Sequence, residues 1–220
     1  MFIGHYGPAF AAKPAAPRVP LWILFVAVQW LDFCWAALVL MGVEKVRIVP
    51  GFTQGSALEL YYMPYTHGLI GALVLSLLFG LVALAFVREK RAAALAVIAA
   101  AVFSHWLLDL LVHVPDLPMF GDADKVGFGL WRWLWISLPL ELAFLLGGAV
   151  VYARAVPSRR RFGDLALWLF VAAMAAVEVY AAFGPAPTSA ADEAKTALMA
   201  YALLALLAGL VDWGRGTVRA

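Results

Sequence analysis

The sequence predicts an all-α fold: a polytopic integral membrane bundle of about six transmembrane helices plus a short N-terminal interfacial or re-entrant helix. Hydrophobic residues make up 65% of the 220 residues and charged residues only 14%. The mean hydropathy of +0.90 lies far outside the usual range for soluble domains. Several stretches exceed the roughly 20 apolar residues that cross a hydrocarbon core about 30 Å thick. We expect these spans to be helices, because a helix satisfies its backbone hydrogen bonds internally.

The chain is expected to form one transmembrane domain, residues 1–220, without a fixed-period repeat or a pair of discontinuous helices. The expected spans are at about residues 19–43, 64–87, 92–114, 134–154, 165–183 and 196–213. Before them, Met1 to Ala12 form a short apolar segment that carries His5 and is interrupted by Gly7-Pro8. This segment is too short to cross a bilayer, so it should lie at the interface or dip into the membrane.

Prolines and charges mark the limits of the first three spans. Pro20 falls in the first turn of the first helix, where proline is tolerated. Pro64 opens the second helix, which puts His67 in its first turn. The charged link 88–91 leads to the third span, which ends at the proline-containing stretch 115–118.

The last three spans have similar limits. Residues 131–135, Trp-Arg-Trp-Leu-Trp, resemble an aromatic belt at a membrane interface before the fourth span. The basic turn 159–161 precedes the fifth span, and the Gly-Pro-Ala-Pro stretch 184–187 separates the fifth from the sixth. Everything outside the spans, including residues 44–63, is expected to be loop or terminus.

Orientation follows from the positive charges. Most of the 16 lysines and arginines fall on one side when the connecting segments are assigned alternately to two faces. The positive-inside rule then places both termini in the cytoplasm, and His67 and His113 near the opposite face. If His5 joins a site with them, either the N-terminal segment re-enters the membrane or this orientation is inverted.

Charge and cysteine content exclude some partners. The net charge of +2 is small and scattered, and no basic stripe interleaved with exposed aromatic residues predicts a nucleic-acid partner. The expected partner is the lipid bilayer. Cys34 is the single cysteine, and its apolar surroundings favour a buried packing role.

The histidines carry the functional signal. His105, Asp109 and His113 are four residues apart, so on a helix they form one stripe that rises about 6 Å per step. Ionisable groups inside membrane helices usually face the bundle interior and mark a site. Imidazole and carboxylate groups suit zinc and other first-row divalent metals, which activate water where the coordination sphere is open.

Residues on other segments can complete this site: Asp32 in the first span, His67 in the second and His5 near the N-terminus. The expected metal ligands are His5, Asp32, His67, His105, Asp109 and His113, and the expected catalytic residues are Asp32, His67, His105 and Asp109. The expected cofactor is a divalent ion, with zinc favoured over manganese.

Simpler roles stay open for several of these groups. His113 and His5 can be ordinary interfacial residues, and His67 can cap a helix. Glu141 and Glu178, inside the fourth and fifth spans, can extend a polar cavity or pair with Arg132 or with each other.

The order of these motifs resembles that of a family of bacterial inner-membrane, LexA-regulated metal-dependent hydrolases. The matching elements, over roughly residues 1–120, are Gly4-His5, Leu31-Asp32, Thr66-His67, and Ser104-His105 with Asp109, followed by Pro115 and Pro118. The resemblance implies a hydrolase with a metal site in the bacterial inner membrane.

The chain departs from the family pattern at several positions. Cys34 stands where the family has its second aspartate, and Trp30 replaces a proline. Gly68 replaces the serine after the histidine, and Met63-Pro64 stand where a His-Arg pair is usual. A Cys34 thiolate can substitute as a zinc ligand, the metal can be bound differently, or the activity can have been lost.

The sequence thus favours a metal-dependent hydrolase whose activated water attacks an ester or phosphoester, with a lipid or other small molecule as substrate. Two alternatives stay open. One is a haem-binding redox protein with two axial histidines. The other is an ion or proton transporter that uses Asp32, Glu141 and Glu178 as a relay.

Overall fold

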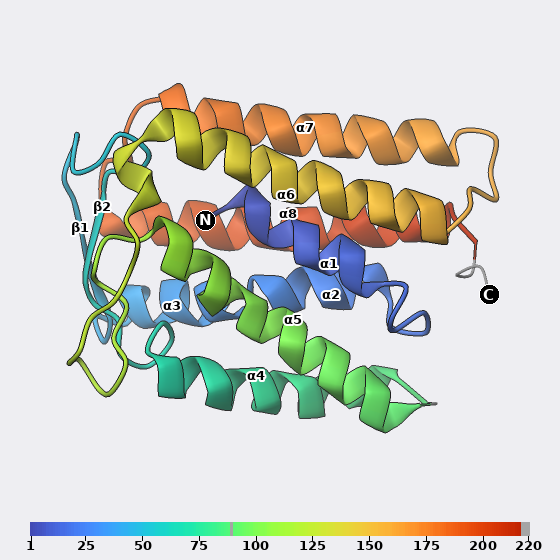
Figure 1. Ribbon diagram of the computed structural model, residues 1–220, viewed down its shortest axis with the longest axis horizontal. Coiled ribbons are helices and arrows are strands. Elements are labelled where there is room, and N and C mark those ends of the chain that lie inside the picture. Colours follow the sequence, from blue (N-terminus) through green and yellow to red (C-terminus); the bar gives the residue numbers. More distant parts are fainter. Residues whose placement is uncertain (89, 217–220) are drawn as a thin grey trace.

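The protein is an elongated bundle of helices with a small hairpin at one end (Figure 1). The computed structural model describes residues 1–88 and 90–216, so Glu89 of the charged link and the last four residues lie outside it. The α-helices are α1 (Tyr6–Ala12), α2 (Leu21–Val28), α3 (Trp30–Leu40), α4 (Leu69–Ala83), α5 (Arg91–Val112), α6 (Leu134–Ala155), α7 (Gly163–Phe183) and α8 (Ala190–Trp213). Short 3-10 helices are η1 (Ile3–His5), η2 (Leu84–Phe86) and η3 (Leu130–Arg132).

Within the described residues, five helices are long and apolar enough to cross a membrane, and counting the bent pair α2–α3 as one span makes six. Their outer faces carry exposed apolar side chains such as Leu77, Tyr180 and Leu206, which contact the lipid bilayer. The structure therefore confirms a polytopic helical membrane protein with the number of spans that hydropathy predicts.

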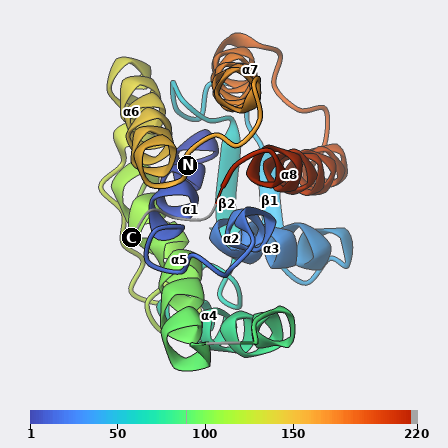
Figure 2. The same ribbon diagram turned by 90° about the vertical axis from the view of Figure 1, so that its right-hand side faces the viewer.

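The N-terminal segment is buried inside the bundle rather than resting on its surface. Figure 2 shows α1 between α2, α5 and α6. Ile3, Tyr6 and Phe10 are fully buried. The close approach of α1 to α6 depends on Gly7 and Gly148, since a Cβ atom on either would collide with backbone of the other helix.

The segment begins inside the bundle, and after α1 the chain turns at the end of the bundle where α2 begins (Figure 1). Lys13 holds the turn, because its ammonium group donates to Asp212 and to the Val19 carbonyl at 2.8 and 2.9 Å. His5 thus lies in the bundle interior although it precedes the first span.

The first span is broken, a feature that hydropathy did not predict. Gln29 has non-helical dihedral angles (φ −109°, ψ 8°), and α2 and α3 meet there at 53°. A helix end leaves backbone carbonyls without partners inside the helix. At the end of α2, the Val28 carbonyl accepts a hydrogen bond from His105 instead.

The segment expected to be a loop between the first two spans contains an antiparallel hairpin. Strand β1 (Lys45–Ile48) pairs with β2 (Leu58–Tyr62), and Arg47 lies opposite Glu59. The expectation was wrong because it followed hydropathy and ignored the apolar residues Val46 and Leu60. These two side chains pack in a small core with Trp35.

Two helix starts differ from the sequence prediction. Helix α4 begins at Leu69, so His67 lies in the turn before it and not in its first turn. Helix α8 begins at Ala190, because Ser189 caps it by accepting from the Asp192 amide. Hydropathy missed this polar first turn.

Candidate metal centre

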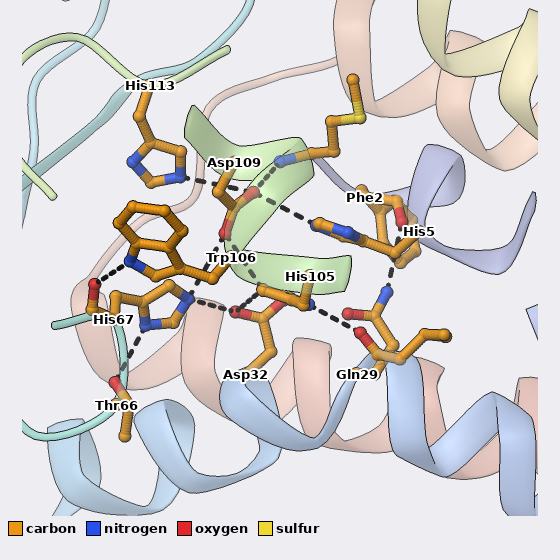
Figure 3. Close-up of polar contacts among 12 residues, drawn as sticks. Phe2, His5, Gln29, Asp32, Thr66, His67, His105, Trp106, Asp109 and His113 are labelled. Carbon is orange, nitrogen blue, oxygen red and sulfur yellow. Dashed lines mark hydrogen bonds and ion pairs between the residues drawn. The ribbon is translucent and has the colours of Figure 1, made fainter. Parts of the chain in front are cut away.

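All four histidines meet around two aspartates in the interior of the bundle (Figure 3). The histidines come from three separate parts of the fold: η1 supplies His5, the turn before α4 supplies His67, and the second half of α5 leads from His105 to His113. Each histidine is at most 3% exposed, so none can exchange its polar contacts freely with water.

One group of atoms lies between α3 and α5. His67 Nε2 lies 3.3 Å from Asp32 Oδ1, and His105 Nε2 lies 3.5 Å from the same oxygen. Asp109 approaches these two rings with Oδ2, at 3.0 Å from His105 Nε2 and 3.6 Å from His67 Nε2.

The other oxygen of Asp109 faces the N-terminal segment. Asp109 Oδ1 lies 3.2 Å from His5 Nε2, 2.6 Å from the α-amino group of Met1 and 3.6 Å from His113 Nε2. The rings of His5 and His105 stack with their centroids 3.7 Å apart. Asp109 therefore contacts every histidine of the site.

Hydrogen bonds on the outer side of three rings determine which nitrogen carries the proton. His105 Nδ1 donates to the Val28 carbonyl at 2.6 Å, since a carbonyl oxygen only accepts. His113 Nδ1 donates to the Asp116 carboxylate at 2.9 Å. In both rings, the lone pair of the neutral imidazole is then on Nε2, directed at Asp109.

His67 is oriented through two further residues. The Thr66 hydroxyl donates to Glu44 Oε2 at 2.6 Å, so its oxygen accepts from His67 Nδ1 at 2.9 Å. Glu44 is buried and also accepts from the Thr66 amide at 3.0 Å. This chain of hydrogen bonds leaves the lone pair of His67 on Nε2, facing Asp32.

Lone pairs of imidazoles and of carboxylates thus converge in a buried space. Two acceptors repel each other unless a proton or a metal ion lies between them, and among the described residues His105 Nε2 has no hydrogen-bond partner. Metal-binding histidines usually donate their other ring nitrogen to a carbonyl, carboxylate or hydroxyl, as here. The donor set fits a divalent metal ion.

Two groups of three residues can hold an ion, because their ligand atoms lie within 4.8 Å of one another: His5, His105 and Asp109, and Asp32, His67 and His105. In the part of the chain that the structure describes, neither His113 nor Cys34 belongs to such a group. Cys34 is half-buried rather than fully buried. The sequence-predicted ligand set is therefore brought together, with His113 at its edge.

Several supporting contacts were not expected from the sequence. Tyr201 on α8 donates its hydroxyl to Asp32 Oδ2 at 3.0 Å, and Trp106 donates Nε1 to the His67 carbonyl at 2.9 Å. Trp131, expected in an interfacial belt, packs on the His113 ring with centroids 4.3 Å apart. Of these residues only Trp106 could have been found from the sequence, because it follows His105 directly. The others depend on approach between distant segments.

Glu141 and Glu178 hold the N-terminal segment in place. Glu141 Oε2 accepts from the Phe2 and Gly4 amides at 2.8 and 3.2 Å, and Glu178 Oε2 accepts from the Ile3 amide at 3.4 Å. Neither forms an ion pair with Arg132 within the described ranges. These bonds fix η1 and with it the position of His5.

A cavity of about 830 Å³ leads to the site. Asp32, His67, Asp109 and His113 line it, whereas His5 and His105 lie behind them and do not. Asp32 is the more accessible carboxylate, with a side chain 15% exposed against 2% for Asp109. A molecule in the cavity would meet Asp32 and His67 first.

Comparison of the chain with protein-family models, with curated proteins and with solved structures found no match.

Proposed function

We propose that the protein is a membrane-embedded, metal-dependent hydrolase that acts on an ester or phosphoester, with a lipid as the favoured substrate. The observation that carries this proposal is the convergence of imidazole and carboxylate lone pairs at the inner end of a large cavity. The motif resemblance to bacterial inner-membrane metal-dependent hydrolases supports the same reaction class.

The ligand set favours a single ion. His105 belongs to both candidate groups, and its Nε2 atom has one lone pair, which serves one metal ion. Nitrogen and carboxylate ligands without a thiolate suit zinc first and manganese second. We assign His5, His105 and Asp109 as the inner ligands, because all three are almost completely buried.

The remaining groups face the cavity and suit acid–base work. A bound divalent ion supplies a Lewis acid that polarises the ester and lowers the pKa of water. Asp32 is placed to accept a proton from that water, and the Tyr201 hydroxyl keeps its other oxygen oriented. His67, 3.3 Å from Asp32, serves instead as a fourth ligand through its Nε2 lone pair, and Asp32 passes the proton on to the leaving group.

Metal analysis tests the proposal directly. Full-length protein purified in detergent should contain about one zinc or manganese per chain by plasma mass spectrometry, and His67→Ala and His105→Ala should contain less. Asp124→Asn is a matched control, because Asp124 is exposed and asparagine tolerates its positive φ of 51°. Metal-free wild type, with His105→Ala unchanged in stability, would contradict the proposal.

A transporter is the second candidate, favoured by the break in the first span. Discontinuous helices form ion sites in many transporters, and here the break at Gln29 lies three residues before Asp32. Ion uptake into proteoliposomes that Asp32→Asn abolishes would support this function. Uptake equal to that of protein-free liposomes would exclude it.

The geometry does not favour haem. Axial histidines approach a haem iron from opposite faces of the porphyrin, whereas the His5 and His105 rings stack directly on each other at 3.7 Å. No space for a porphyrin separates them. A visible spectrum of the purified protein without a Soret band would settle the point.

A further inference from the structure

The cavity continues from the metal centre to the ends of two spanning helices. Beyond Asp32 and His67 it is lined by Val177 and Ala181 of α7 and by Ala197 of α8. The ends of α7 and α8 that contain these residues lie together at the hairpin end of the bundle (Figure 1). The side of the cavity formed by these lipid-contacting helices thus includes apolar residues next to polar ones, and the cavity is polar at the metal centre.

Most of the acidic and basic side chains that line this cavity are carboxyl groups. Besides Asp32 and Asp109, the lining includes four carboxylates from three helices: Glu141, Glu178, Asp192 and Glu193. No lysine or arginine side chain in the described part of the chain lines it. Among the described residues, the basic groups in the lining are the α-amino group of Met1 and the imidazoles of His67 and His113, and Asp109 contacts all three.

Two of these carboxylates have capacity left for a ligand. Asp192 is occupied by Ser189 and Thr188 hydroxyls, and Glu141 by two backbone amides. Glu178 accepts one long bond of 3.4 Å. The side chain of Glu193 has no hydrogen bond or ion pair within residues 1–88 and 90–216, although the residue is half-buried.

Aromatic side chains complete the lining. Trp35 and Tyr201 line the cavity, as does Trp131, which packs on His113. Trp35 is only 4% exposed, yet its Nε1 has no hydrogen-bond partner among the described residues. Aromatic faces with nearby carboxylates and no competing cation are the usual surroundings of a bound ammonium group.

We propose that the cavity binds an amphiphile with an ammonium group, whose head is bound by Glu178 and Glu193 and whose hydrocarbon chain lies along Val177, Ala181 and Ala197. An anionic amphiphile would be repelled by the same carboxylates. This inference rests on the proposed function where it identifies the ammonium amphiphile as the substrate class of the hydrolase. The binding of the ammonium group does not depend on the metal.

The experiment titrates full-length protein in dodecyl maltoside with decyltrimethylammonium, decyl phosphate and choline, and follows tryptophan fluorescence. Decyltrimethylammonium should bind most tightly, since it combines charge and chain. The double variant Glu178→Gln/Glu193→Gln should bind it about tenfold more weakly. Glu59→Gln, on the exposed hairpin, is the matched control and should bind like wild type.

Metal content and thermal unfolding are measured on the same samples. If the double variant does not fold, the single variant Glu193→Gln replaces it in the titration. Preference for decyl phosphate, or equal binding by wild type and variant, would overturn the inference. Choline binding as tightly as decyltrimethylammonium would overturn its amphiphilic part. If wild-type protein prefers decyltrimethylammonium but contains no metal, the result supports the ammonium-binding site and contradicts the proposed hydrolase.

Discussion

The imidazole rings of His5 and His105 lie parallel, with an interplanar angle of 7° and centroids 3.7 Å apart. Two imidazolium cations would repel each other strongly at this distance in a buried site. At least one ring is therefore neutral and has a lone pair for a metal ion. This stacking also makes the N-terminal segment part of the candidate metal centre.

The first prediction concerns His5. His5→Ala should weaken metal binding by at least about tenfold, because it removes a ring that contacts Asp109. The measurement is competition with a chromophoric chelator. Tyr6→Phe is the control: it is equally buried, and its hydroxyl has no partner among the described residues. Equal metal affinity in His5→Ala and Tyr6→Phe would remove His5 from the ligand set.

The second prediction concerns the residues behind His67. Glu44→Gln and Thr66→Val should each lower metal affinity by roughly 10–100-fold, because the Nδ1 proton of His67 loses its fixed acceptor. Neither change removes a ligand. Chelator competition with Glu59→Gln as control measures the effect, and wild-type affinity in both variants would show that His67 is not a ligand oriented by this pair.

The third prediction separates the two aspartates. Asp109→Asn should abolish metal binding, since this side chain contacts all four histidines. Asp32→Asn should retain most of the metal but lower hydrolysis of a fluorogenic ester by about 10²–10⁴-fold, as expected for loss of a general base. Metal loss in Asp32→Asn and retention in Asp109→Asn would reverse these assignments.

The fourth prediction tests the packing of the N-terminal segment. Gly7→Ala would place a methyl group against the Phe144 carbonyl, so we expect a loss of stability of about 1–3 kcal/mol and reduced metal content as η1 shifts. Gly147→Ala is the matched control, because a Cβ atom there meets nothing within 4 Å. Thermal unfolding and metal analysis compare the two variants. Identical behaviour would show that α1 is not tightly held.

The fifth prediction concerns orientation. In a Cys34→Ser background, a cysteine at the exposed position 122 should react with an impermeant maleimide added outside intact cells. A cysteine at the exposed position 15 should react only after the membrane is opened, because the positive-inside rule places that turn in the cytoplasm. The opposite labelling pattern would invert the topology.

Much of the fold could be predicted from composition and local pattern. Long apolar stretches identify the spans, because each must match the thickness of the hydrocarbon core. The spacing of His105 and Asp109 identifies a shared helix face, and their burial follows from the cost of exposing such groups to lipid. Hydropathy did not predict the break at Gln29 or the start of α8 at the Ser189 cap, because both depend on backbone geometry and not on hydrophobicity.

The sequence by itself determined that this is a helical membrane protein with ionisable residues grouped in its spans, because hydropathy and helical spacing are properties of neighbouring residues. Only the tertiary structure decided that His5 enters the site, that the Val28 carbonyl orients His105, and that Tyr201 holds Asp32. These contacts depend on how closely separate helices approach. That distance is set by pairs such as Gly7 and Gly148, which are far apart in the chain.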